Sequence, residues 1–325
     1  MPDSWSYRAP RWLPGGNLQT IWPALAARHH DGIAPQWRRE RWTTPDGDFI
    51  DADWQDAASV QAPVVVLFHG LEGSSSSHYA KAFAAATREH GWHLVVPHFR
   101  GCSGELNLAP RAYHSGDFEE VGWMLERVHA ARPGPIVAVG VSLGGNALLR
   151  WAEECGDVAG RTVSAIAVVC APLDLTAGGQ ALGHGFNRAV YTPMFLRTLK
   201  PKALAKLAQH PGLFDRERML AARDLYEFDN VVTAPLHGFR DTDDYWSRAS
   251  AKPHLHRIHI PALVLNARND PFVPAASLPT SDCVGRYVTL WQPQGGGHVG
   301  FPSGVFPSHV LGMPATLLHW LALHV

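Results

Sequence analysis

The chain has 325 residues, of which 46% are hydrophobic and 18% are charged, and its formal net charge is −1. This length and apolar content allow a sizeable buried core and exclude a disordered chain. Because the total charge is close to zero, there is no general electrostatic attraction to nucleic acid or to an acidic membrane, and no nucleic-acid partner is expected.

The N-terminus and the cysteines bear on location. Residues 1–5 show no basic start followed by an apolar run, so no signal peptide is expected. No apolar run reaches about 18 residues, so no transmembrane segment is expected and lipid contact would be peripheral at most. The four cysteines form no CxxC pair, which argues against a zinc ribbon or a thioredoxin-like motif. Their even number allows disulfides in an oxidising compartment, but a chain of this length does not need them, so reduced thiols in a cytoplasmic protein are expected. The 19 histidines show no HExxH. His254, His256 and His259 could bind a metal, but they run into an apolar strand with no carboxylate in register, so no metal site is expected.

The first predicted elements form a hairpin. Strands are expected over 38–42 and 49–54, and Pro45, Asp46 and Gly47 supply the turn between them. Continuous apolar runs then predict strands buried on both faces at 63–68, 93–97, 135–140 and 163–169. Helical spacing and composition predict helices at 78–90, 117–131 and 143–152. This alternation predicts an α/β fold, with a mostly parallel central sheet flanked by helices.

The pattern changes between residues 173 and 252, where helical segments occur without a buried strand. The best helical stretches there are 194–209 and 216–226. Strands return at 262–266 and 286–291, and a last helix is expected over 308–324. Because long insertions between strands are usually functional, 173–252 is predicted to be a helical cap or lid on a core made of 1–172 and 253–325. The alternative is a surface excursion that contributes packing alone.

The strongest functional signal is the GxSxG sequence at 140–144, which follows a predicted strand and opens a predicted helix. This is the context of a nucleophile elbow, a turn so tight that the serine backbone is strained and its neighbours must lack bulk. Gly140 and Gly144 meet that need. The turn would project the Ser142 hydroxyl above the sheet, beside the positive end of a helix dipole. Ser142 is therefore the predicted nucleophile.

A serine nucleophile needs a base and an orienting acid, which follow it in the order acid and then histidine. Asp270 comes just after the strand predicted to end near Asn266, and His298 stands in a glycine-rich loop after the last strand. His298 would take the serine proton and pass it to the leaving alcohol, and Asp270 would hold the imidazole. A turn-capping role is the alternative for Asp270, and a surface loop position is the alternative for His298. The rival acids lie in the insertion rather than after a strand: Asp241, Asp243 and Asp244.

The predicted oxyanion hole combines two backbone amides. One belongs to Leu143, the residue after the nucleophile, and the other is expected from Leu71 in the loop after the strand that ends at Phe68. Gly70 has no side chain, so it would let this loop lie close to the nucleophile. His69 is expected to support this loop through hydrogen bonds rather than to take part in chemistry.

Several motifs resemble the YheT-like branch of the α/β-hydrolase superfamily, and together they cover most of the sheet-forming chain. They are Asn17-Leu18-Gln19-Thr20-Ile21, the hairpin with Thr44-Pro45-Asp46-Gly47 and Asp51-Ala52-Asp53-Trp54, the glycine loops His69-Gly70-Leu71-Glu72-Gly73 and Arg100-Gly101-Cys102-Ser103-Gly104, Tyr113-His114-Ser115-Gly116, and Gly140-Val141-Ser142-Leu143-Gly144-Gly145-Asn146. The insertion matches less distinctly. The resemblance implies a cytoplasmic, cofactor-free carboxylesterase or acylglycerol-lipase-like enzyme.

The predicted function is hydrolysis of a small-molecule carboxylic ester through an acyl-enzyme, with short- or medium-chain acylglycerols as a substrate class. An alcohol acyltransferase with the same triad, a non-catalytic binding protein on the same fold and a cofactor-free halide peroxidase are the alternatives. The sequence leaves the oligomeric state open. Five apolar residues of the insertion are either an acyl-pocket lining or the insertion's own core: Phe186, Tyr191, Met194, Phe195 and Leu196.

Overall fold

A computed structural model describes residues 6–325, and the signal-peptide expectation concerns residues 1–5, which lie outside this range. Eight strands form one sheet in the order β1-β2-β4-β3-β5-β6-β7-β8. Their bounds are β1 Arg38–Thr43, β2 Phe49–Gln55, β3 Val64–Phe68, β4 His93–Pro97, β5 Ile136–Val141, β6 Ala165–Val169, β7 Ala262–Leu265 and β8 Val288–Trp291. Pairing is antiparallel from β1 to β2 and from β2 to β4, and parallel across the rest of the sheet. The predicted hairpin and the predicted parallel sheet are confirmed.

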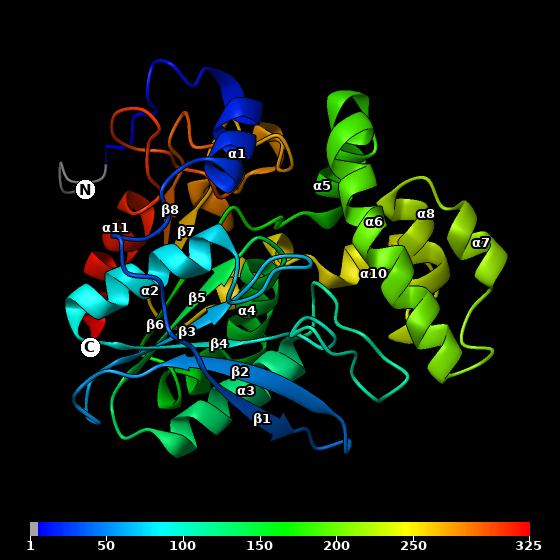
Figure 1. Cartoon of the computed structure of the whole chain (residues 1–325), viewed down its shortest axis with the longest axis horizontal. Helices are drawn as coiled ribbons and strands as arrows, with labels where there is room; N and C mark the ends of the chain where they lie inside the picture. The colour runs from blue at the N-terminus through cyan, green and yellow to red at the C-terminus, as the bar shows by residue number, and fades with distance from the viewer. Residues whose placement is uncertain (1–5) are drawn as a thin grey trace.

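Helices cover both faces of the sheet (Figure 1). The pleat divides the side chains of the buried strands between two cores. In β3, Val64, Val66 and Phe68 pack on one side with apolar residues of α3 (Phe118–Ala131) and α4 (Leu143–Cys155). Val65 and Leu67 point to the opposite side, toward α2 (His78–His90) and α11 (Gly312–Leu321). Successive strand residues face opposite ways, so a continuous apolar run is needed when both faces are covered.

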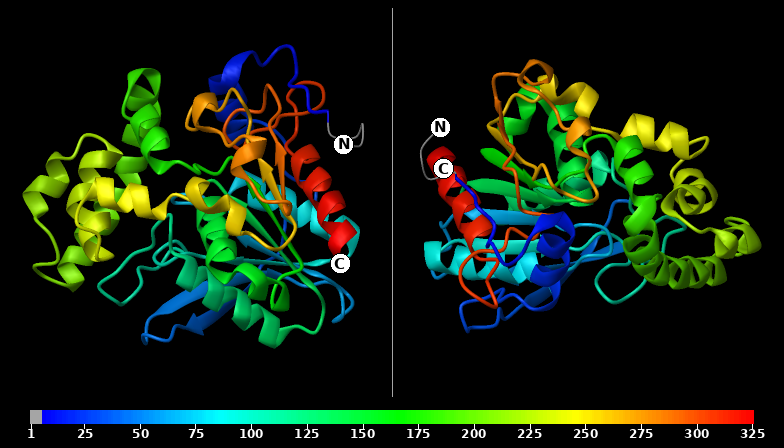
Figure 2. Two further views of the ribbon diagram at one scale, coloured as in Figure 1. Left: turned by 180° about the vertical axis from the view of Figure 1, so that it is seen from behind. Right: turned by 90° about the horizontal axis from the view of Figure 1, so that it is seen from above.

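The segment between β6 and β7 is helical, as expected, and it lies to one side of the sheet, away from both chain ends (Figure 2). Its helices are α5 Leu175–Leu182, α6 Gly185–Gln209, α7 Arg216–Ala221, α8 Leu225–Phe228, α9 Ala234–Leu236 and α10 Thr242–Ala249, with a π-helical turn at Asp229–Thr233. The helix expected over 216–226 is divided in two, because the Asp224 carboxylate accepts a hydrogen bond from the Glu227 amide and begins a new helix. Helix α6 begins nine residues before its predicted start at 194 and continues through Pro193 and Pro201.

Two terminal elements differ from expectation. Helix α1 (Gly15–Leu25) was not predicted, since it opens with two glycines and contains Pro23. The last helix spans Gly312–Leu321 rather than 308–324, because Ser308 is buried in a left-handed conformation with φ of 72°. Over residues 6–325, none of the helices has the length and hydropathy needed to cross a bilayer.

Candidate active site

Ser142 occupies a strained turn between β5 and α4. Its φ is 52° and its ψ is −119°, a conformation that non-glycine residues rarely adopt. The Ser142 amide donates to the carbonyl of Val169 in the neighbouring strand, at 2.8 Å. Leu143 begins α4, so its amide has no carbonyl partner within the helix. The strand therefore holds the serine rigidly, with free helix amides beside its hydroxyl.

Close backbone contacts explain the glycines around this turn. A Cβ on Gly140 would lie 2.5 Å from the Gly145 Cα, and one on Gly144 would lie 2.5 Å from the His69 carbonyl oxygen. A Cβ on Gly70 would lie 3.2 Å from the Ser142 Cβ. Any side chain at the first two positions would force the elbow away from β3 or from its own helix. The glycines are therefore a steric requirement of the turn.

The structure brings Ser142, His298 and Asp270 together from three distant loops. The His298 Nε2 atom lies 2.9 Å from the Ser142 Oγ, and its Nδ1 atom lies 2.8 Å from the Asp270 Oδ2. The carboxylate can only accept, so Nδ1 carries the proton and Nε2 is left to accept from the serine hydroxyl. This proton placement is the tautomer that a general base requires. The Phe272 ring packs on the imidazole, with ring centroids 4.2 Å apart.

Asp270 also has the turn-capping role that was its alternative. Its Oδ1 accepts hydrogen bonds from the amides of Phe272, at 2.7 Å, and Val273, at 3.2 Å. The two oxygens therefore serve different partners, and the turn fixes the carboxylate that faces His298. The rival Asp241 is instead the N-cap of α10, where it accepts from the Asp244 amide.

One cluster of metal-ligand atom types lies at this site. Cys170, Asp270 and His298 place one ligand atom each within 4.8 Å of one another. Both ring nitrogens of His298 already have partners in Asp270 and Ser142. The Cys170 thiol is fully buried, which raises its pKa well above the ordinary value and keeps it protonated. This arrangement fits hydrogen bonding better than metal coordination.

The loop after β3 is held by buried hydrogen bonds. The Phe99 amide donates to His69 Nε2 at 3.1 Å, so His69 Nδ1 carries the ring proton and donates to the Gly70 carbonyl at 2.8 Å. Burial lowers the pKa of His69 to about 3, which keeps the ring neutral. The Gly70 amide donates to the Tyr79 hydroxyl. Leu71 lines the same cavity as Ser142 and Leu143.

Helix α1 contacts both loops that carry the predicted base and the predicted acid, and the sequence did not predict this contact. The Thr20 hydroxyl accepts from the His298 amide at 2.8 Å and donates to the Gly16 carbonyl. The Gln19 Oε1 accepts from the Gly296 amide at 2.8 Å and from the Asn269 side chain at 3.0 Å. The side chain of Asn269 in turn accepts from the Gly297 amide. These contacts join residues about 250 to 280 positions apart in the chain.

The backbones of α1 and the two loops approach closely. A Cβ on Gly16 would lie 1.8 Å from the Asn269 carbonyl oxygen, and one on Gly300 would lie 1.8 Å from the Gln19 carbonyl oxygen. A side chain at either position would separate the helix from the loop. The Asn17-Leu18-Gln19-Thr20-Ile21 motif thus has a structural role, which is to position His298 and the residue before Asp270.

Thr20→Val is expected to lower kcat for ester cleavage roughly 10-fold with little change in KM, because it removes the acceptor that holds the His298 backbone and a small displacement of a catalytic group is costly. Steady-state kinetics on a p-nitrophenyl ester would measure this. Thr20→Ser keeps the hydroxyl and is expected to retain near-normal kcat. Equal activity of the valine and serine variants would contradict the positioning role.

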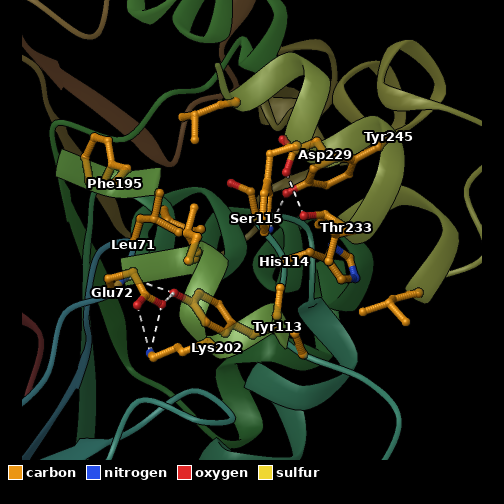
Figure 3. A pocket seen from close by; sticks show the side chains of 18 of the residues that line it. Leu71, Glu72, Tyr113, His114, Ser115, Phe195, Lys202, Asp229, Thr233 and Tyr245 are labelled. Atoms are coloured by element: carbon orange, nitrogen blue, oxygen red, sulfur yellow. Dashed lines mark hydrogen bonds and ion pairs between the residues drawn. The ribbon is translucent and has the colours of Figure 1, made fainter. Parts of the chain in front are cut away.

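Ser142, Leu143 and His298 open into a cavity of about 180 Å³ between the sheet edge and the helical insertion. Figure 3 shows this cavity, with Leu71 on the side of the sheet and Phe195 on the side of the insertion. Its walls are mostly apolar. The cavity side chains contributed by the insertion include Leu182, Phe195, Leu199, Phe214, Leu225, Phe228, Val232 and Leu236.

Each cation in the described cavity wall has an ion-pair or hydrogen-bond partner within the protein. Lys202 lies 2.9 Å from the carboxylate of Glu72, which also accepts from the Tyr113 hydroxyl. Lys206 donates to the carbonyls of Asn107 and Ala109, and Arg100 pairs with buried carboxylates of Asp48 and Glu120. No lysine or arginine of the described cavity lining is left free for an anionic ligand.

Asp229 is a carboxylate in the cavity wall without a cationic partner among the described residues. Figure 3 shows it beside Thr233 and Tyr245, and it accepts from the Thr233 hydroxyl and the Trp246 indole. Burial raises the pKa of Asp229 to about 6. At neutral pH a carboxyl group with this pKa is mostly ionised, so this end of the cavity is polar and carries a negative charge that is lost as the pH falls below about 6.

The five apolar residues of the insertion, for which a pocket lining and a core of the insertion were both open, divide between the cavity, buried clusters and the surface. Of the five residues predicted, Phe195 alone lines the cavity. Tyr191 and Leu196 are buried in hydrophobic clusters instead, and Phe186 and Met194 are about half exposed. Residues that close in sequence point in different directions around α6, so they cannot share one wall.

Comparison with known proteins is consistent with this geometry. Residues 63–305 match the family model of the alpha/beta hydrolase fold. The chain belongs to the α/β-hydrolase family. It is 38% identical to the candidate esterase YheT of Escherichia coli, over 95% of this chain and 91% of that protein. It is 32% identical to the phospholipase ABHD3 of mouse, over 84% of this chain and 68% of that protein.

More distant α/β-hydrolase relatives include the monoacylglycerol lipase of Saccharomyces cerevisiae, with 26% identity over 81% of this chain and 59% of that protein. Among solved structures, the Pyrococcus furiosus esterase Pf2001 gives a TM-score of 0.57 at 16% identity, covering 89% of this chain and 91% of that one. Mouse α/β-hydrolase domain-containing protein 10 gives 0.54 at 14% identity, covering 88% and 98%. These structural likenesses support the fold. The named relatives place this chain among esterase- and lipase-like hydrolases.

Proposed function

We propose that this α/β-hydrolase cleaves carboxylic esters through an acyl-enzyme on Ser142, with His298 as general base and acid and Asp270 as the orienting acid. The observation that carries the proposal is the continuous hydrogen-bond chain from the Ser142 hydroxyl through His298 to Asp270. The amides of Leu143 and Leu71 are the proposed oxyanion donors, since both residues line the cavity beside Ser142. Gly70 and His69 would shape and support the Leu71 loop.

The proposed substrates are uncharged esters with short or medium acyl chains, including acylglycerols. A dry apolar cavity of about 150 Å³ holds a benzene molecule. The cavity here, of about 180 Å³, therefore fits a chain of roughly that size, and its paired cations offer no site for an anionic chain. We assign the cap role to residues 173–252 because side chains of that segment line the cavity opposite Ser142.

A chain-length series of p-nitrophenyl esters from acetate to palmitate tests this assignment. The expected kcat/KM is highest at about four to eight carbons. Phe195→Ala enlarges the cavity and should move the optimum toward longer chains. Phe186→Ala changes an exposed phenylalanine of the same helix and should leave the optimum in place. A wild-type optimum at palmitate, or equal shifts in the two variants, would contradict the assignment.

Acyl transfer to an alcohol uses the same acyl-enzyme and is the second candidate. Glycerol added to the reaction distinguishes the two, because hydrolysis yields free acid and transfer yields a new ester. A binding protein without catalysis is distinguished by a fluorophosphonate probe, which labels an activated serine. A cytoplasmic location is also proposed, since all four cysteines are free thiols.

A further inference from the structure

Helix α1 has an apolar face that nothing in the described structure covers. Its inner side carries Gln19, Thr20 and Pro23, which are buried against the loop of His298. Leu18, Trp22 and Leu25 follow the spacing i, i+4 and i+7, so they share the opposite side of the helix. Leu25 is 82% exposed and Leu18 is 47% exposed.

Neighbouring segments extend this face. The rings of Trp12, Trp22 and Phe306 contact one another, with centroid separations of 5.4 to 5.7 Å. The Trp22 indole donates to the carbonyl of Pro307, which holds the loop beside the helix. Phe306 is 69% exposed and Val305 is 80% exposed. We refer to this surface as the α1 face, and it consists of Trp12, Leu18, Trp22, Leu25, Val305 and Phe306.

The segments that carry the α1 face contain exposed arginines and no aspartate or glutamate. Residues 6–30 and 299–325 contain no aspartate and no glutamate. Arg8, Arg11 and Arg28 are exposed, and across residues 6–325 the structure records no ion pair from any of them. These two segments therefore carry a positive charge of their own, although the whole chain has a net charge of −1.

Helix α6, which contacts α1, also exposes apolar side chains and has no acidic residue. The Tyr191 hydroxyl of α6 donates to the Asn17 side chain of α1, so the two helices are in contact. Phe186, Val190 and Met194 are exposed at a spacing of four residues on α6. No acidic residue occurs between residues 175 and 209. Two neighbouring helices thus expose apolar side chains without acidic residues among them.

We propose that the α1 face docks on an anionic lipid surface. Contiguous exposed apolar surface marks an interface. Tryptophan and leucine partition into the boundary between headgroups and acyl chains, while arginines of the same segments reach anionic headgroups. A symmetric dimer through this face would bring the arginines of both copies together with no carboxylate of these segments between them, which is unfavourable. The lipid surface is therefore the occupant that fits both the apolar and the charged part.

Vesicle flotation with the full chain carrying Ser142→Ala tests the proposal independently of the proposed esterase activity. The probes are phosphatidylcholine vesicles with and without one-third phosphatidylglycerol. The protein is expected to float with the anionic vesicles, and 0.5 M salt is expected to release part of the bound protein. Arg8→Ala with Arg11→Ala should weaken partitioning about 30-fold, from about fivefold per arginine. Arg161→Ala, an exposed arginine elsewhere, should have no effect.

The apolar part is tested by Leu25→Glu combined with Val305→Glu, which should abolish flotation. Both side chains project into solvent, so the variant should keep normal turnover of soluble p-nitrophenyl butyrate when Ser142 is present. Val60→Glu, at a 61% exposed valine before β3, is the matched control and should still float. Failure of the Ser142→Ala chain to float with either vesicle, or unchanged flotation of the double glutamate variant, would overturn the proposal. A dimer that the double variant converts to monomer, without vesicle binding, would assign the face to a second copy instead.

Discussion

Ser142→Ala is expected to lower ester cleavage by about 10³-fold or more, because the acyl-enzyme cannot form without the hydroxyl. The residual rate would come from substrate binding and the oxyanion amides, which the substitution leaves in place. The fold should be unaffected, since the backbone of residue 142 stays in its strained conformation and its amide still donates to Val169. Steady-state kinetics and thermal unfolding of the two proteins measure both parts.

A fluorophosphonate probe supplies the control for this experiment. It should label the wild-type chain at one serine and leave Ser142→Ala unlabelled. Turnover of a p-nitrophenyl ester by Ser142→Ala at more than a tenth of the wild-type rate would rule out the nucleophile assignment. Labelling at another serine would do the same.

Asp270→Asn is expected to lower kcat by about 10³- to 10⁴-fold with a small effect on stability. The two Asp270 oxygens have separate partners, so an asparagine can keep the turn through its carbonyl oxygen. Its amide group would then face His298 as a donor, which imposes the opposite tautomer on the imidazole and removes the base at Nε2. The activity loss would therefore appear without a matching loss in melting temperature.

Asp270→Ala separates the two roles further. It should lose activity as well as stability, since the amides of Phe272 and Val273 would lose their acceptor, and an unpaired buried amide costs about 1–3 kcal/mol. If the asparagine variant kept near-normal kcat, Asp270 would be a turn residue alone. If both variants were equally unstable, the assignment of separate roles to the two Asp270 oxygens would be incorrect.

The hydrogen-bond geometry also shows why α1 escaped prediction. Gln19 and Thr20 act on loops almost a full chain length away, and neither polar side chain has a local signal that marks it as buried. The helix itself has poor intrinsic propensity, with Gly15, Gly16 and Pro23 in its span. Tertiary packing against the His298 loop stabilises it. The motif at 17–21 was a resemblance in the sequence, and its physical role became visible through contacts.

The lining of the cavity illustrates a second limit. Apolar residues in α6 could be predicted to be helical, but helical periodicity does not say which side of a helix meets the sheet and which meets solvent. Tyr191 and Phe195 face the core and the cavity, while Phe186 and Met194 face outward. That choice depends on how α6 packs against α5, α7 and α1, and each of those contacts is made between separate elements.

The sequence by itself determined the parallel sheet, the flanking helices and the three residues that the structure joins by hydrogen bonds. Those features are encoded locally, in runs of β-branched residues, in the glycines around Ser142, and in the order of residues after successive strands. Only the tertiary structure decided the distances between the three side chains, the residues that hold them in place and the walls of the cavity. These depend on packing between segments far apart in the chain, and a local pattern carries no information about such contacts.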